Sequence, residues 1–223
     1  MSPYAVHAAL DGGSTDVRCG LCRRMEPPYA KAAAYGSYKS GLRDLIHMLK
    51  YQNVRLAANV LGRMLAEVIA DLEPGWGEAS VVVVPVPLFA RKLRQRGFNQ
   101  AEVIARAALK LTAAKDRYAL CPDALERSRE TQSQIGLTRH QRREDLRGAF
   151  RVRHRDKISG REVLLVDDVF TTGTTASECA RVLRRAGASL VWVATVARTL
   201  KAEVQGIRLE PQDDEALTMA AHG

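Results

Sequence analysis

The sequence VLLVDDVFTTGTT, which runs from Val163 to Thr175, sets the class of fold. Its four leading aliphatic residues are typical of a strand that is buried on both faces of a parallel sheet. Two adjacent acids, Asp167 and Asp168, follow them, and a threonine-rich run around Gly173 then leads into a helical pattern. Open α/β sheets bind their ligands at the carboxyl ends of their strands. The segment therefore predicts a strand, a loop and a helix, with a binding site at the loop.

The residue types in this segment indicate a phosphorylated ligand. Two neighbouring carboxylates repel one another, so a partner such as sugar hydroxyls or a divalent metal is expected at Asp167 and Asp168. A helix N-terminus with free N–H groups and hydroxyls suits a phosphate, and Gly173 permits close backbone approach. The loop residues predicted to surround a phosphate are Thr171, Thr172, Gly173, Thr174 and Thr175. A strand end followed by an N-capping threonine cluster is the structural alternative, and a P-loop fits less well because no Lys follows the Gly.

The rest of the chain alternates strand and helix patterns, which predicts a mostly parallel central sheet flanked by helices. Residues 81–84 are four valines, and we expect them to form a central strand. Helices are predicted for two segments joined near residues 52–53, for residues 99–111 and for residues 175–186; further strands are predicted at residues 120–125, around 150–152 and at 190–196.

Three regions follow from these patterns. Residues 1–34 show no clear period and are predicted to form a small loop-rich N-terminal appendage. Residues 35–201 form the predicted α/β domain, and residues 202–223 a loose C-terminal tail.

Composition narrows the classes of partner. The 34 Lys and Arg residues exceed the 25 Asp and Glu residues, and the resulting charge of +9 favours phosphate-rich partners. No apolar run approaches the roughly 20 residues of a membrane helix, and residues 1–16 lack the apolar core of a signal peptide. We therefore expect a cytoplasmic protein without membrane insertion. Cys121 and Cys179 fall in predicted core elements, so they are interpreted as buried thiols.

Two basic segments follow other predicted elements. Pro85, Val86 and Pro87 end the four-valine strand, and four cations lie in the next nine residues, Arg91 and Lys92 among them. A solvated basic loop is the alternative interpretation. Residues 127–147 are rich in Arg and poor in core candidates, so they are predicted to form a mobile lid over the site or, alternatively, a surface that contacts nucleic acid.

The segment Val163–Thr175 resembles the phosphoribosyl pyrophosphate motif of type I phosphoribosyltransferases. Together with residues 45–51, 96–100, 129–131 and 134–137, it makes residues 19–199 similar to the ComF family of competence-associated proteins. The resemblance implies the type I phosphoribosyltransferase fold, an N-terminal zinc ribbon and a link to DNA uptake.

The resemblance also implies roles for the predicted site residues. Asp167 and Asp168 would hold the ribose 2′ and 3′ hydroxyls with Mg²⁺ nearby, while the loop at 171–175 would hold the 5′-phosphate. The segment with Pro85, Val86, Pro87, Arg91 and Lys92 would bind pyrophosphate, and a cis bond before Pro85 or Pro87 could supply its turn. Arg127 and Arg129, at the start of the lid, would neutralise pyrophosphate as it leaves.

Zinc binding is predicted only in part. Cys19 and Cys22 have the spacing of one ligand pair, whereas a structural zinc site needs about four ligands. The sequence therefore favours a degenerate or truncated ribbon over a complete one.

Two functions stay open from the sequence. One is an enzyme that transfers phosphoribose to an unidentified nitrogenous acceptor, with an N-terminal hood that includes His47 and Tyr51. The other is a non-catalytic module that senses phosphoribosyl pyrophosphate or a nucleotide and binds DNA or proteins of the uptake machinery. The resemblance leaves a homodimer open as well.

Overall fold

The computed structural model describes residues 5–6, 26–52, 55–112, 115–130 and 144–199. The strands are β1 (Ala5–Val6), β2 (Lys31–Ser37), β3 (Val81–Pro85), β4 (Tyr118–Leu120), β5 (Leu125–Arg127), β6 (Phe150–Val152), β7 (Glu162–Phe170) and β8 (Leu190–Arg198). The helices are α2 (Ser40–Tyr51), α3 (Arg55–Leu72), α4 (Ala90–Arg96), α5 (Gln100–Leu109) and α7 (Thr174–Arg185), with short 3₁₀ turns η1 (Glu73–Gly75) and η2 (Lys115–Arg117).

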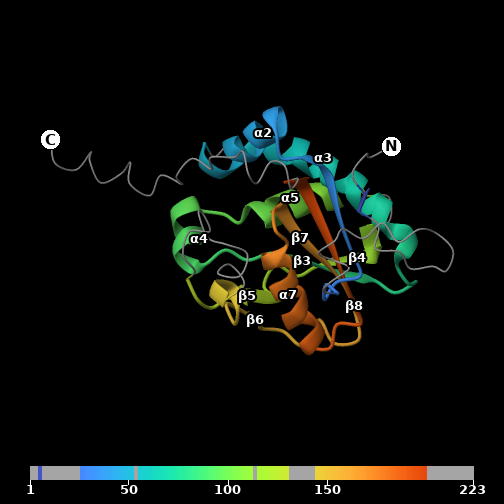
Figure 1. Ribbon diagram of the computed structural model, residues 1–223. Coiled ribbons are helices and arrows are strands. Elements are labelled where there is room, and N and C mark those ends of the chain that lie inside the picture. Colours follow the sequence, from blue (N-terminus) through green and yellow to red (C-terminus); the bar gives the residue numbers. More distant parts are fainter. Residues whose placement is uncertain (1–4, 7–25, 53–54, 113–114, 131–143, 200–223) are drawn as a thin grey trace.

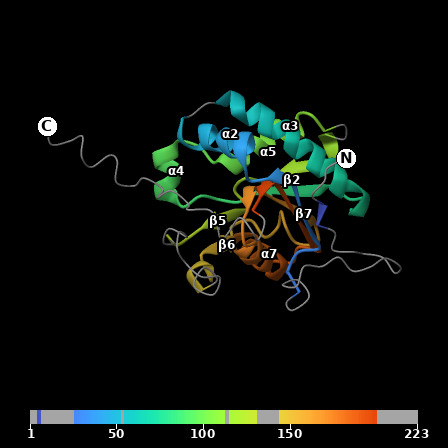
Figure 2. The same ribbon diagram turned by 45° about the horizontal axis from the view of Figure 1, so that its top comes forward.

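Six strands form the central sheet, in the order β1-β2-β8-β7-β3-β4. Every neighbouring pair is parallel except β1 and β2, which are antiparallel. β5 and β6 form a separate antiparallel pair. Helices α2, α3 and α5 lie on one side of the sheet, and α7 with the β5–β6 pair lies on the other (Figures 1 and 2). The predicted α/β class with a mostly parallel sheet is confirmed.

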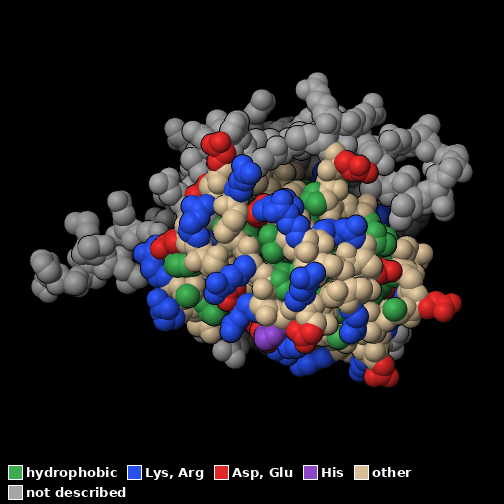
Figure 3. Space-filling view, turned by 90° about the horizontal axis from the view of Figure 1, so that it is seen from below, with side chains coloured by type: hydrophobic (Ala, Val, Ile, Leu, Met, Phe, Trp, Pro, Cys, Tyr) green, Lys and Arg blue, Asp and Glu red, His purple; other side chains and the backbone are tan. Residues whose placement is uncertain are grey.

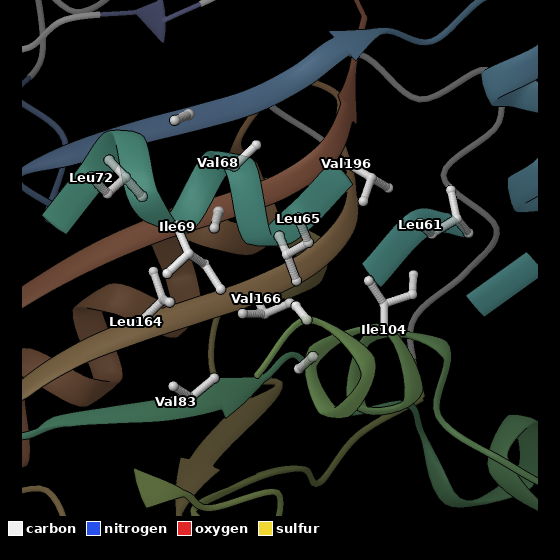
Figure 4. Packing of buried hydrophobic residues seen from close by; sticks show 14 of the residues in the cluster. Leu61, Leu65, Val68, Ile69, Leu72, Val83, Ile104, Leu164, Val166 and Val196 are labelled. Atoms are coloured by element: carbon white, nitrogen blue, oxygen red, sulfur yellow. The ribbon is translucent and has the colours of Figure 1, made fainter. Parts of the chain in front are cut away.

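Alternation along the strands explains these two layers, because successive side chains of a strand point to opposite faces. In β7, Leu164 and Val166 join the core under α2, α3 and α5, whereas Val163 and Leu165 join the core under α7. Figure 4 shows the first of these cores, where leucines and isoleucine of α3 pack on the sheet beside α5. Burial on both faces is why the strands of the sheet centre are almost wholly apolar.

Most predicted elements are present, and the differences have local causes. The four-valine strand is central, between β7 and β4. The strand predicted at residues 120–125 is instead two, because Pro122 has no N–H to continue the pairing and the Ala124 N–H donates to the Cys121 carbonyl in a turn. Each half joins a different sheet.

The N-terminal part enters the sheet earlier than the sequence suggests. β2 begins at Lys31, and Lys31–Ala34 pair with β8, so they are part of the central sheet although the predicted appendage ends at residue 34. The predicted tail and residues 7–25 lie outside the described residues. No helix in the described part of the chain is long and apolar enough to cross a membrane.

Candidate functional site

Asp167 and Asp168 lie within β7, and the strand continues to Phe170. Because side chains alternate along a strand, the two carboxylates point to opposite faces of the sheet. Asp168 follows Leu164 and Val166 on the face of α2 and α5, where it is buried. Asp167 lies on the other face, where its charge contributes to raising the pKa of the Cys179 thiol, after burial as the larger cause.

Asp168 is held by side chains from two helices. Lys50, at the end of α2, forms an ion pair with Oδ2 of Asp168. Gln100, at the start of α5, donates from Nε2 to Oδ1 at 3.2 Å. The exposed fractions of the Lys50 and Asp168 side chains are only 19% and 6%, so water screens this ion pair weakly. Asp168 is therefore a buried carboxylate with a donor on each of its oxygens.

Further side-chain contacts lead from Gln100 back to α2. Arg96, the last residue of α4, donates from Nη1 to Oε1 of Gln100 at 2.5 Å. Its guanidinium lies 5.7 Å from the centre of the Tyr51 ring, and the Tyr51 and His47 rings are 4.5 Å apart. Of the hood residues predicted from the sequence, Tyr51 thus connects to Asp168 through the side chains of Arg96 and Gln100. His47 connects to the same series through its contact with Tyr51.

The two aspartates titrate in opposite directions. Burial and the neighbouring Asp168 carboxylate both raise the pKa of Asp167 well above its usual value. Burial would also raise the pKa of Asp168, but the charge of Lys50 and the hydrogen bonds that Asp168 accepts lower it below its usual value. The pKa of Lys50 also shifts. Burial lowers it, but the charge of Asp168 and the hydrogen bond to Asp168 raise it by more, so the pKa of Lys50 lies above its usual value. At neutral pH the Lys50–Asp168 pair is therefore ionised.

The threonine loop turns sharply into α7. Gly173 has φ +74°, in the left-handed region, and a Cβ at this position would lie 2.6 Å from Cζ of Phe170. Only glycine therefore fits between the strand end and the helix start. The hydroxyls of Thr172 and Thr174 lie 2.8 Å apart, and Gly173 offers no side-chain cap to the first N–H groups of α7, which have no partners within the helix, as at any helix start.

The segment after β3 is anchored to β7 through its backbone. The Val86 N–H donates to the Val166 carbonyl at 2.8 Å, and the Val86 carbonyl accepts from Nδ2 of Asn99 at 3.0 Å. Pro85, Val86 and Pro87 are all buried. The bonds before Pro85 and Pro87 are trans, so the predicted cis turn is wrong. The Val86 N–H already has a backbone partner and is not available to a pyrophosphate.

The cations predicted for the pyrophosphate segment lie on α4. Arg91 donates from Nε to Oε1 of Glu130 at 2.8 Å, which links α4 to the beginning of the predicted lid. The other cation, Lys92, is partly buried on the same helix. Arg91 and Lys92 are thus the second and third residues of α4, four and five residues after Pro87, on a separate element from the buried Pro85–Pro87 segment.

Arg127 and Arg129 flank the end of β5. The Arg127 guanidinium lies 5.6 Å from the centre of the Phe150 ring, and burial lowers its pKa while nearby acids, Asp167 among them, oppose that shift. Arg129 donates to the carbonyls of Asp145 and Arg147. Its side chain therefore joins the two sides of the predicted lid at their base. Residues 131–143 of that lid, and Cys19 and Cys22, lie outside the described residues.

Sequence reasoning gave no role to Lys50 and Gln100, although both lie in segments that carried the family resemblance. A signal was available for each. Lys50 is four residues after the buried Ile46, and Gln100 is four residues before the buried Ile104, so both polar residues lie on the inward side of a helix. A buried lysine needs a partner of opposite charge, which identifies a carboxylate nearby.

Comparison with known proteins agrees with this arrangement. The family model described as Phosphoribosyl transferase domain matches residues 55–206, which include β3, α5, β7 and the loop before α7. The chain belongs to the phosphoribosyl transferase domain family. The family and the type of fold expected from the sequence are thereby confirmed.

This phosphoribosyl transferase domain protein is similar to several individual proteins, one of which has a name that refers to DNA. It is 33% identical over 186 residues to the DNA utilization protein YhgH of Escherichia coli (strain K12), covering 82% of this chain and 78% of that protein. It is 30% identical over 201 residues to Competence protein F of Haemophilus influenzae, covering 88% and 85%. Among solved structures, glutamine phosphoribosylpyrophosphate amidotransferase from B. subtilis matches with a TM-score of 0.37 and 26% identity, over 64% of this chain and 26% of that one.

Proposed function

We propose that this protein binds magnesium-complexed phosphoribosyl pyrophosphate and transfers its phosphoribosyl group to a nitrogenous acceptor. The observation that carries the proposal is the buried Asp168 in β7, held by Lys50 and Gln100, three residues before the loop that turns into α7. Lys50 and Gln100 offset the desolvation of this carboxylate, and its position near the carboxyl end of a central strand suits acceptance of sugar hydroxyls.

Different residues of the site are proposed to bind the ribose and the 5′-phosphate of the ligand. Asp167 and Asp168 would accept from the ribose hydroxyls, and the loop at 171–175 with the start of α7 would bind the 5′-phosphate. In the reaction, the bond from the sugar C1 to pyrophosphate breaks, pyrophosphate leaves with the electron pair, and an acceptor nitrogen forms the new bond and loses its proton to solvent. We assign neutralisation of the departing pyrophosphate to cations of α4 and β5, among them Arg91 and Arg127.

The two carboxylates also lie where the Mg²⁺ ion bound to phosphoribosyl pyrophosphate is proposed to enter the site. Carboxylate oxygens suit Mg²⁺, which keeps several waters and binds mainly through one or two carboxylates and substrate phosphates. Among the described residues, no group of three or more His, Cys, Asp and Glu side chains could hold a metal ion. The metal would be held in large part by the phosphates of the ligand, whose charge it would neutralise, with the two aspartates nearby.

Calorimetry tests the binding. We expect heat of binding when phosphoribosyl pyrophosphate and Mg²⁺ are added to the wild-type protein, and none for the double variant Asp167→Asn with Asp168→Asn. Asp71→Asn, a change of the same kind at an exposed position on α3, is the matched control and should bind as wild type does. Equal binding by the double variant would remove the proposed site.

A non-catalytic module that contacts DNA is the second candidate, and the charge of +9 favours it. Figure 3 shows Lys and Arg side chains spread over the face seen from below, with acidic side chains among them. Several basic side chains in and after β6 are paired: Arg151 and Arg153 with Glu126, and Lys157 with Asp123. Such pairing lowers the net field that a phosphate backbone would meet.

One experiment separates the two candidates. Release of pyrophosphate is measured across a panel of purine and pyrimidine bases, and a DNA mobility shift is run on the same preparation. Pyrophosphate release that depends on one base supports the transferase. DNA binding without release on any base supports the module.

A further inference from the structure

The end of α2 reaches Asp168 by two separate routes. Lys50 pairs directly with Oδ2 of Asp168. The adjacent Tyr51 lies beneath the Arg96 guanidinium, Arg96 donates to Gln100, and Gln100 donates to Oδ1. Each oxygen of this carboxylate therefore has a donor: Lys50 from α2 itself, and Gln100, which Arg96 connects to the same turn of α2. Asp167, by contrast, faces the other side of the sheet.

Lys50 places a positive charge where a divalent cation would otherwise bind. Its ammonium group contacts Oδ2, and the exposed fractions of the two side chains, 19% and 6%, leave little room for water between them. At such burial the effective dielectric constant is low, so the ammonium strongly repels a second cation at the same oxygen. Gln100 supplies an uncharged donor to the other oxygen, which keeps the orientation of the carboxylate fixed.

We propose that Lys50 is a positioning residue that serves as the resident counter-ion of the pocket. It holds the Asp168 carboxylate in a fixed orientation as an acceptor for ligand hydroxyls, and its charge keeps Asp168 from binding a divalent cation directly. A metal then enters the site together with the phosphates of the ligand. The inference rests on the proposed function only for the identity of that ligand.

A merely structural role makes a different prediction. If Lys50 only anchored α2 to the sheet, its replacement would lower stability and leave the affinity of the free protein for a divalent cation unchanged. As resident counter-ion, Lys50 suppresses that affinity, so removal of its charge should raise it. Cation affinity in the absence of any sugar phosphate is therefore the measurement that distinguishes the roles.

The experiment uses Mn²⁺ alone and follows the free ion by electron paramagnetic resonance. Wild-type protein is expected to bind Mn²⁺ weakly, and Lys50→Gln at least about tenfold more tightly, because a nearby unit charge has been removed from a buried carboxylate. Lys50→Arg, which restores the charge, should return the affinity to the wild-type level. Lys110→Gln, the same change at the exposed end of α5, is the matched control and should behave as wild type. Equal Mn²⁺ affinity for Lys50→Gln and wild type would overturn the inference.

Two further variants locate the effect and protect the test against misfolding. The gain in Lys50→Gln should disappear when Asp168→Asn is added. Lys50→Met, which removes the same charge, should show the same gain in Mn²⁺ affinity if Lys50→Gln does not fold, and absence of the gain in a folded Lys50→Met would contradict the inference. No phosphoribosyl pyrophosphate is present, so failure of the wild type to bind that ligand would remove the proposed function and leave this result standing.

Discussion

At the scale of single residues, the two adjacent aspartates are chemically unlike. Asp168 is an ionised group in a buried ion pair, whereas the raised pKa of Asp167 makes its neutral form easier to keep. The pleat of β7 sends the two side chains to different faces of the sheet. Asp168 there meets the charge of Lys50, which lowers its pKa, whereas burial and the charge of Asp168 raise the pKa of Asp167. Substitution by Asn keeps the shape of the side chain and removes its charge, so it should change the stability of the protein differently at the two positions.

We expect Asp168→Asn to lower the free energy of unfolding by about 3 kcal/mol, because it leaves the Lys50 ammonium buried without its counter-charge. Chemical denaturation at pH 7 measures this. Adding Lys50→Met should recover much of the loss, since no buried charge then remains. An Asp168→Asn variant as stable as wild type would contradict the buried ion pair.

Asp167→Asn should show a pH dependence of the opposite kind. A carboxyl whose pKa is raised on folding contributes stability below its unfolded pKa of about 3.9 and loses it as the pH rises through its folded pKa. Wild type and Asp167→Asn should therefore be equally stable near pH 4, and the variant equally or more stable at pH 7. Unfolding curves at the two pH values test this; a variant that is less stable only at pH 7 would reverse the assigned direction.

At the scale of elements, α3 and α5 approach so closely that their contact requires glycine. A Cβ on Gly62 would lie 2.5 Å from Cβ of Ala107 and 3.0 Å from backbone atoms of α5. Backbone atoms cannot move aside as the end of a flexible side chain can. The start of α5 carries Gln100, so this contact also helps to place a donor of Asp168.

Gly62→Ala should therefore destabilise the protein by about 1–3 kcal/mol, in spite of the better helix propensity of alanine. Gly41→Ala in α2 is the control, because nothing lies within 4 Å of its added Cβ; it should be neutral or stabilise by up to about 1 kcal/mol. Thermal and urea unfolding of the two variants side by side give the comparison. Equal effects at the two glycines would show that the helix contact is looser than described.

Glu178 connects α7 to the segment before β6. Its Oε1 accepts from the Gly148 N–H at 2.8 Å, and its Oε2 accepts from Nε of Arg181 at 2.9 Å. Burial alone would raise the pKa of Glu178, but these hydrogen bonds and Arg181 lower it. A carboxyl whose pKa is lowered on folding stabilises the protein above its unfolded pKa and loses that stabilisation as the pH falls through its folded pKa.

Glu178→Gln should cost about 2 kcal/mol at pH 7, and the difference from wild type should shrink as the pH falls below about 4. Unfolding by urea over this pH range is the measurement. Glu102→Gln removes one partner of the exposed Glu102–Arg106 pair and should change stability by less than about 0.5 kcal/mol. A pH-independent difference for Glu178→Gln would argue against the ionised contact.

At the scale of the whole molecule, the site joins parts of the chain that are far apart in sequence. Lys50, Gln100 and Asp168 come from α2, α5 and β7, and the loop at 171–175 leads into α7 on the opposite side of the sheet. A ligand that spans Asp168 and this loop would therefore contact both layers. Such a ligand stabilises the folded chain as a unit.

Phosphoribosyl pyrophosphate with Mg²⁺ should accordingly raise the melting temperature. At a ligand concentration of about 100 times the dissociation constant the gain is about 2.7 kcal/mol, or roughly 5–10 °C for a chain of this size. Differential scanning fluorimetry measures the shift, with ribose 5-phosphate and Mg²⁺ as a control for the phosphate alone. A shift no larger than that of ribose 5-phosphate would mean that the pyrophosphate makes no contact of its own.

The sequence by itself was sufficient for the α/β class, the central four-valine strand, the helices on either side and the position of the aspartates before a glycine turn. These features depend on local rules: apolar runs, helical spacing and the backbone freedom of Gly173. It did not supply the partners of Asp168, nor which sheet each half of the 120–125 segment joins. Those were decided by tertiary structure, because the pleat of β7 selects which carboxylate meets α2, and the packing of helices brings Lys50 and Gln100 to it across 118 and 68 positions of the chain.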